Sequence, residues 1–130
     1  MKNNLLRLVV VPCALFAALV HILKTPDHFS TAPWLGVLFV LDSAAFLALA
    51  IWILLRPSRI AELIVGLLGV GTAAGYVISR TIGLPAIARL PWDTLGVAVS
   101  VVEAILAFVV AAGLRTHAEA GATSEQRRVA

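Results

Sequence analysis

Four long apolar segments constrain the fold of this chain more than any other feature of its sequence. They cover approximately residues 5–24, 33–55, 60–82 and 94–114, and each supplies about the 20 apolar residues that a helix needs to cross a bilayer. Hydrophobic residues make up 61% of the 130 positions and charged residues only 13%. The sequence therefore predicts an all-α, polytopic membrane protein, with a bundle of four transmembrane helices in residues 1–114 and a flexible cytoplasmic tail in residues 115–130.

The basic residues indicate how the four segments cross the membrane. All ten lie near segment ends or in the tail, and they divide unequally between the two sides. Seven lie on the side of the termini (Lys2, Arg7, Arg56, Arg59, Arg115, Arg127 and Arg128) and three on the opposite side (Lys24, Arg80 and Arg89). Because cytoplasmic loops carry the excess of lysine and arginine, we expect both termini to be cytoplasmic and the protein to lie in a bacterial plasma membrane, the inner membrane of the cell. The basic residues form no patch, so nucleic acid is not an expected partner.

The two halves of the chain are similar around the segment ends opposite the termini. Each half has a cation, a threonine and a Pro-Trp pair at matching positions: Lys24 and Arg80, Thr25 and Thr81, and residues 33–34 and 91–92. This alignment, which needs short gaps in the loops, predicts a parallel repeat of two helices about an axis along the membrane normal. Chance similarity is the alternative. In either case the cations and tryptophans suit the membrane interface.

Two acidic residues lie too deep in the apolar segments to act as interfacial anchors. Asp42 is roughly 12 Å along a helix from Trp34, and Glu103 is roughly 16 Å from Trp92. A carboxylate at this depth is costly and normally faces the protein interior or a wet cavity. The spacing therefore predicts that both carboxylates face the inside of the bundle.

Three further polar residues extend these carboxylates into an outward-facing cluster. We expect Asp42 and Glu103 at its bottom, Tyr76 between, and His21 and Arg80 nearer the mouth. These five residues are the candidates for binding a small ligand, an ion or a proton. The alternative is structural: Arg80 neutralises one carboxylate, the other is protonated, and the cluster only fixes how the helices pack.

The histidines near the first loop suggest a second kind of site. His21 and His28 are seven residues apart, but Pro26 is expected to end the first helix between them, in a loop at 25–33. With Asp27 and the deeper carboxylates, they supply nitrogen and oxygen ligands of the kind that zinc and copper accept. The alternative leaves His28 solvated in the loop and His21 as an interfacial hydrogen-bonding residue.

Three runs of sequence carry a resemblance to a group of membrane proteins. They are His21 with TPDH at 25–28, PWLGVLF at 33–39 and SRTIGLP at 79–85. In these runs the chain resembles small four-helix integral membrane proteins of actinobacterial type, which have a similar histidine- and proline-containing first loop, a Ser-Arg-Thr-x-Gly-Leu-Pro run and an acidic residue in the last helix. The resemblance implies the four-helix architecture and gives weight to Arg80 and Glu103. Those proteins are uncharacterised, so it implies no activity.

Two classes of function remain open. The sequence contains no CxxC, no HExxH, no phosphate-binding glycine loop and no Ser-His-Asp arrangement, so we expect no enzyme. In the first class, the polar cluster binds or conducts a small ligand, an ion or a proton, within a homo-oligomer in the bilayer. In the second, the chain is a non-catalytic accessory subunit of a larger membrane complex, and the polar residues serve assembly.

Overall fold

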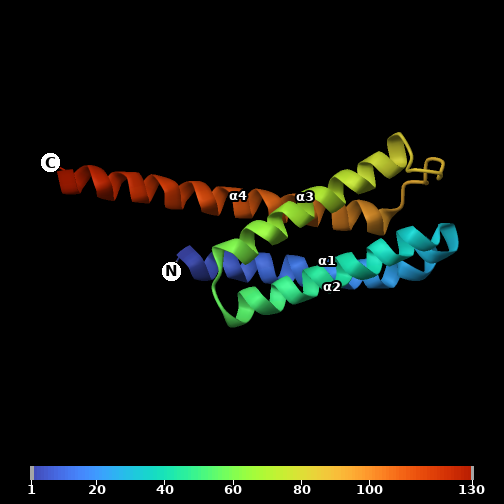
Figure 1. The fold of residues 1–130 in the computed structure, drawn as a ribbon, viewed down its shortest axis with the longest axis horizontal. Helices are drawn as coiled ribbons and strands as arrows, with labels where there is room; N and C mark the ends of the chain where they lie inside the picture. The colour runs from blue at the N-terminus through green and yellow to red at the C-terminus, as the bar shows by residue number, and fades with distance from the viewer. Residues whose placement is uncertain (1, 130) are drawn as a thin grey trace.

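The computed structural model describes the backbone of residues 2–129 and the side chains of residues 7–115. This part of the chain forms four helices: α1 (Lys2–Thr31), α2 (Pro33–Leu55), α3 (Arg59–Thr81) and α4 (Thr94–Val129). α1 and α2 form a close antiparallel hairpin, α3 crosses α4 at an angle, and both ends of the chain lie at the same end of the bundle (Figure 1). Each helix contains a stretch long and apolar enough to cross a membrane, which confirms the predicted four-helix transmembrane bundle.

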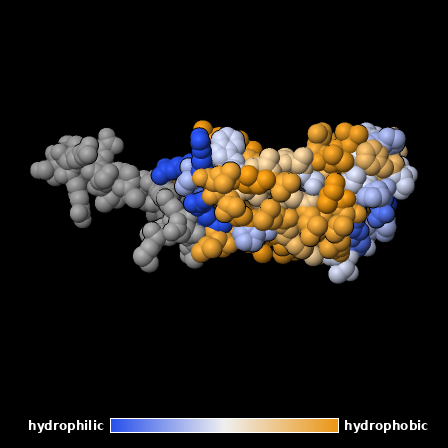
Figure 2. Space-filling model, turned by 90° about the horizontal axis from the view of Figure 1, so that it is seen from below, coloured by the Kyte–Doolittle hydropathy of each residue, from blue (hydrophilic) through white to orange (hydrophobic). Residues whose placement is uncertain are grey.

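The surface of the bundle fits a bilayer. A broad apolar band covers the middle of the face in Figure 2, and hydrophilic residues lie at both of its ends. Large side chains in the apolar stretches, such as Leu55 and Phe108, are each 74% exposed, which suits contact with lipid acyl chains. We call the end that carries residues 31–33 and 82–93 the loop end, and the end that carries the N-terminus and residues 55–59 the terminal end.

α1 and α4 are longer than the sequence predicted. We expected the first helix to end near residue 24 and Pro26 to break it, but α1 continues through Pro26 to Thr31. The expected loop at 25–33 is thereby reduced to Ala32. The backbone of α4 also remains helical as far as Val129, through the segment that we expected to be a flexible tail.

Two side chains near Pro26 donate hydrogen bonds to backbone carbonyls of α1. The Thr25 hydroxyl donates to the His21 carbonyl at 2.9 Å, and His28 Nδ1 donates to the Lys24 carbonyl at 2.8 Å. Neither bond replaces the one to the Ile22 carbonyl that Pro26 removes, but a single missing bond costs less in lipid than the several that a broken helix would expose. The consequence for the site is that His21 and His28 lie two turns apart on one continuous helix.

The terminal half of the bundle is a packed apolar core. Its buried side chains come from all four helices and include Val10, Ala14, Phe46, Ile53, Ala61, Val65, Leu106 and Val110. Gly69 brings α3 close to α4, because a Cβ at this position would lie 2.9 Å from the Glu103 carbonyl oxygen. This close approach of the two backbones places Glu103 at the boundary between the core and the loop half.

The connection between α3 and α4 folds back over the loop end. Leu84 and Ile87 exchange backbone hydrogen bonds across a tight turn, and the Leu90 N–H donates to the Ser79 carbonyl at 2.9 Å. Asp93 then begins α4 as its N-terminal cap, because its Oδ1 accepts the Gly96 N–H at 2.8 Å. The carboxylate of Asp93 is thereby fixed above the ends of α1 and α3.

Candidate functional site

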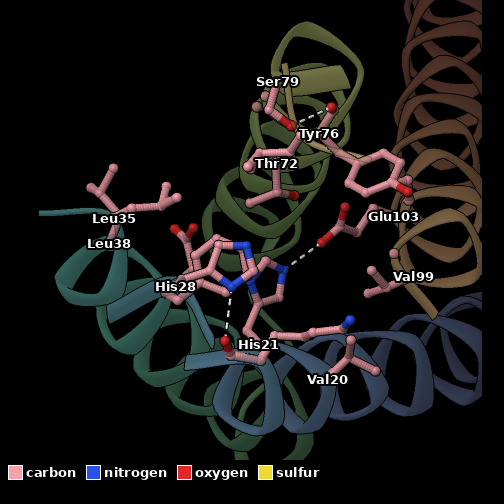
Figure 3. A pocket seen from close by; sticks show the side chains of 18 of the residues that line it. Val20, His21, His28, Leu35, Leu38, Thr72, Tyr76, Ser79, Val99 and Glu103 are labelled. Atoms are coloured by element: carbon pink, nitrogen blue, oxygen red, sulfur yellow. Dashed lines mark hydrogen bonds and ion pairs between the residues drawn. The ribbon is translucent and has the colours of Figure 1, made fainter. Parts of the chain in front are cut away.

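A cavity of about 390 Å³ lies among the four helices in the loop half. All five residues of the predicted ligand cluster line it: His21, Asp42, Tyr76, Arg80 and Glu103. They come from every helix of the bundle, and several of them are shown in Figure 3. The volume falls in the range of small-molecule sites, about 300–1,000 Å³.

His21 and Glu103 form a buried pair at the bottom of the cavity. His21 Nε2 donates to Glu103 Oε1 at 2.8 Å, and the two residues are only 6% and 1% exposed (Figure 3). The carboxylate fixes which ring nitrogen carries hydrogen, since Nε2 must be the donor to an ionised Glu103. The sequence predicted both residues as members of the cluster but placed His21 nearer the mouth, whereas the structure brings it into direct contact with Glu103 at the bottom.

The second ring nitrogen of His21 has no partner in the protein. The ring packs between Phe39 and Phe46, with centroid distances of 5.0 and 5.7 Å. Within the described residues, His21 Nδ1 and the Ser100 hydroxyl, both on residues that line the cavity, are buried without a hydrogen bond. A buried polar atom of this kind usually has a partner, so these two atoms mark where a bound polar group would be stabilised.

Asp93 is the centre of the polar network at the loop end. Its Oδ1 forms an ion pair with Lys24 Nζ at 2.9 Å, and its Oδ2 accepts a hydrogen bond from Arg80 Nη2 at 3.1 Å. The Tyr76 hydroxyl donates to the Asp93 carbonyl at 3.1 Å. One residue thus joins α1, α3 and the start of α4.

The charge of Asp93 is stabilised by these contacts. Burial alone would raise the pKa of its carboxyl, but hydrogen bonds from Lys24, the Gly96 N–H and Arg80 outweigh burial and hold the pKa below its usual value. Asp93 is therefore ionised at neutral pH.

Sequence reasoning missed Asp93 as part of the site. The signals were present: an aspartate directly before an apolar helix is a typical N-cap, and Lys24 and Arg80 lie at the same end of the bundle. Lys24 and Arg80 are also the aligned cations of the proposed repeat, whereas Asp93 falls in a gap of that alignment. The repeat itself stays a prediction.

Arg80 does not pair with a deep carboxylate, which corrects the structural alternative drawn from the sequence. Its guanidinium contacts Asp93, donates to the Ser79 hydroxyl at 2.9 Å, and lies 4.4 Å from the centroid of the Tyr76 ring. Of the two carboxylates that this alternative offered to Arg80, Glu103 is held by His21 instead, and Asp42 has no ion pair among the described residues. Arg80 thus serves mainly to fix the loop end of the bundle, although its Nε lacks a partner among the described residues.

Asp42 differs from the other two carboxylates of the cavity. It is partly buried in α2 and lines the cavity, within electrostatic range of His21 and Glu103. In the part of the chain that the structure describes, its carboxylate forms no hydrogen bond and no ion pair. Asp42 is therefore the cavity carboxylate that is available to form a hydrogen bond or an ion pair with a group inside the cavity.

The three residues predicted as metal ligands do not form a common site. His28 lines the cavity, but its Nδ1 is used by the Lys24 carbonyl and its ring stacks on Phe39 at a centroid distance of 3.7 Å. Asp27 is exposed and lies outside the cavity lining, whereas His21 is bound to Glu103. Among residues 7–115, no group of three or more histidine, cysteine or acidic side chains is arranged to hold a metal ion.

Together, the fold and the cavity define a small four-span membrane protein with a polar site in one half of its bundle. No protein family, curated protein or solved structure matches the chain. Its chemistry is therefore read from the cavity alone, in which donors, acceptors and one unpaired carboxylate lie among apolar and aromatic walls.

Proposed function

We propose that this membrane protein binds a small ligand in the cavity of its loop half. The observation that carries the proposal is that three buried polar atoms on residues that line the cavity, His21 Nδ1, Arg80 Nε and Ser100 Oγ, have no hydrogen-bond partner in the described part of the chain. Each such atom costs about 1–3 kcal/mol when it stays unpaired. A ligand with polar groups recovers this free energy on binding, which favours a binding site over a purely structural cluster.

The packing of the terminal half favours binding over permeation. Below Glu103 the centre of the bundle is filled by apolar side chains such as Phe46, Ile53 and Leu106, each 0% exposed. A permeation path for an ion or a proton would need polar groups or water through this region. Phe46, Ile53 and Leu106 lie outside the lining of the cavity, so the cavity does not extend through this core.

The same proposal includes an orientation. The seven-to-three division of basic residues supports a cytoplasmic terminal end, so the cavity would be reached from outside a bacterial plasma membrane. The resemblance to four-helix proteins of actinobacterial type is consistent with this location.

A second candidate function, an accessory subunit or a homo-oligomer, is favoured by one feature of α3. A Cβ built at Gly71 or at Gly75 would have no neighbour within 4 Å; both glycines line the cavity, and Gly71 is also exposed at the surface of the bundle. Small residues at this spacing allow a helix of another chain to approach closely. Native mass spectrometry of the protein extracted from its own membrane would show such a partner.

Cysteine labelling in intact cells tests the binding cavity and its orientation. In a Cys13→Ala background, we expect Ser100→Cys to react with a membrane-impermeant thiol reagent added from outside, because Ser100 lines the cavity. Ser30→Cys is the matched control at the loop end, and Pro57→Cys is the control at the terminal end.

The pattern of labelling decides the result. Reaction at positions 30 and 100 but not at position 57 supports an outward-facing cavity. If position 100 stays unreactive while position 30 labels, the cavity is closed and the accessory-subunit function is favoured. If only position 57 labels, the orientation is wrong.

A further inference from the structure

The three carboxylates that line the cavity are not equally compensated. Asp93 has two cationic partners, Lys24 and Arg80, and Glu103 accepts a hydrogen bond from His21. Asp42 has neither an ion pair nor a hydrogen bond among the described residues. An uncompensated carboxylate inside a membrane protein is costly, and a bound cation would reduce that cost. The charge arrangement therefore favours a positively charged ligand at Asp42.

The walls around Asp42 suit an organic cation better than a hydrated metal ion. Trp34 lines the same cavity, together with apolar side chains such as Leu35, Leu38 and Val99. The rings of Phe39 and Tyr76 also line it, but they already contact His28 and Arg80, which leaves Trp34 as the ring with an open face. Aromatic faces attract cations, and they do so most strongly where water is excluded. By contrast, a metal ion needs several oxygen or nitrogen ligands, and residues 7–115 supply no group of three acidic, histidine or cysteine side chains for one.

The cavity also opens toward the lipid between α2 and α3. Leu38 of α2 and Leu67 of α3 both line the cavity, yet they are 45% and 62% exposed at the surface of the bundle. Gly71 lies at the same opening and has no side chain to close it. These two helices contact each other much less than α1 contacts α2, or α3 contacts α4. A ligand with an apolar body can therefore reach the cavity from the bilayer.

From these three observations we infer that the ligand of this cavity is a lipophilic organic cation, held by Asp42 and the aromatic wall, with its apolar part between α2 and α3. This inference rests on the proposed binding function and specifies its ligand class. The competing occupant is an amphipathic anion at Lys24 and Arg80. Because both cations are already bound to Asp93, an anion would have to displace an existing ion pair, whereas a cation at Asp42 displaces none.

Two organic ions of matched shape and opposite charge test the inference. Tetraphenylphosphonium and tetraphenylborate are added separately to the full-length protein in nanodiscs of neutral lipid, and binding to empty nanodiscs is subtracted. We expect saturable binding of tetraphenylphosphonium and no saturable binding of tetraphenylborate. Asp42→Asn should weaken phosphonium binding by at least about tenfold, since it removes a charge contact worth more than about 1.4 kcal/mol.

Control variants separate loss of the site from loss of the fold. Asp27→Asn removes an exposed carboxylate at the same end of the bundle and should leave phosphonium affinity unchanged. Asp42→Glu keeps the charge and should retain most of the affinity. Thermal unfolding without any ligand identifies a variant that is simply misfolded. In that case the difference between phosphonium and borate binding to the wild-type protein still decides whether the site prefers a cation.

The outcomes distinguish this inference from the proposed function. Protection of Ser100→Cys from labelling by tetraphenylphosphonium would support both. If Ser100→Cys labels but only tetraphenylborate binds, or if Asp42→Asn binds phosphonium as well as the wild type does, the cation inference is overturned while the cavity stands. If Ser100→Cys is unreactive and neither ion binds, the proposed binding function fails as well.

Discussion

The loop half and the terminal half of this bundle are held together by different interactions. In the terminal half, apolar side chains such as Phe46, Ile53 and Leu106 fill the centre. In the loop half, polar contacts join the helices around an unfilled volume, with Asp93 connecting α1, α3 and α4, and Glu103 connecting α4 to α1. Lipid tails are as apolar as leucine, so burial alone does not drive helices together in a bilayer. The comparison shows that one half provides close packing while the other encloses a cavity.

The largest effect should come from Glu103, where the two halves meet. Glu103→Ala removes the partner of a buried histidine and should lower the free energy of unfolding by about 3–5 kcal/mol. Glu103→Gln keeps an acceptor for His21 Nε2 and should cost only about 1 kcal/mol. Denaturant unfolding in bicelles would measure both. Equal and small losses of stability in the two variants would show that the bond between His21 and Glu103 does not hold α1 to α4.

Leu106 tests the terminal half in isolation. Leu106 is 0% exposed in the apolar core and does not line the cavity, so Leu106→Ala should cost about 2–5 kcal/mol through the space that it leaves. Ligand affinity should not change in bundles that remain folded. The matched control is Ile105→Ala, on the exposed side of the same helix, which should have little effect. A change in phosphonium affinity in Leu106→Ala would contradict the separation of the two halves.

A double-mutant cycle on Arg80 tests the pairing within the loop half. Because Arg80 contacts Asp93, the changes Arg80→Ala and Asp93→Ala should show a coupling of about 0.5–3 kcal/mol in unfolding experiments. The corresponding cycle between Arg80 and Glu103, which form no contact in the structure, should be closer to additive. The reverse result would restore the pairing that the sequence had suggested as an alternative.

The smallest expected effect is on the stability of the protein at acid pH, through the protonation of Asp93. The pKa of Asp93 is lower in the folded protein than in the unfolded chain, so its stabilising contribution is fully present above the unfolded pKa of about 3.9. This contribution is lost as the pH falls from there through the folded pKa. The thermal stability of the wild type should therefore fall across this pH interval more than that of Asp93→Asn. Parallel curves for the two proteins would show that the loop end does not depend on this charge.

Much of the candidate site could be predicted from the sequence, because depth in a membrane follows from position along a span. The apolar segments place Asp42 and Glu103 far from either interface, and their cost in lipid predicts that they face inward. The same local reasoning failed at Pro26, because it ignored how strongly lipid favours an unbroken helix over exposed backbone groups. It also missed Asp93, whose role depends on two residues from other helices.

The sequence by itself determined the number of spans, their class and the level at which the polar residues lie, because these follow from length and hydropathy along the chain. Only the tertiary structure decided which polar residues meet. His21 and Glu103 are 82 positions apart, and their contact depends on how α1 and α4 are rotated about their own axes. The path of the connection before α4 decided that Lys24 and Arg80 converge on Asp93. That convergence, together with the bond between His21 and Glu103, leaves Asp42 as the cavity carboxylate without a partner in the described chain.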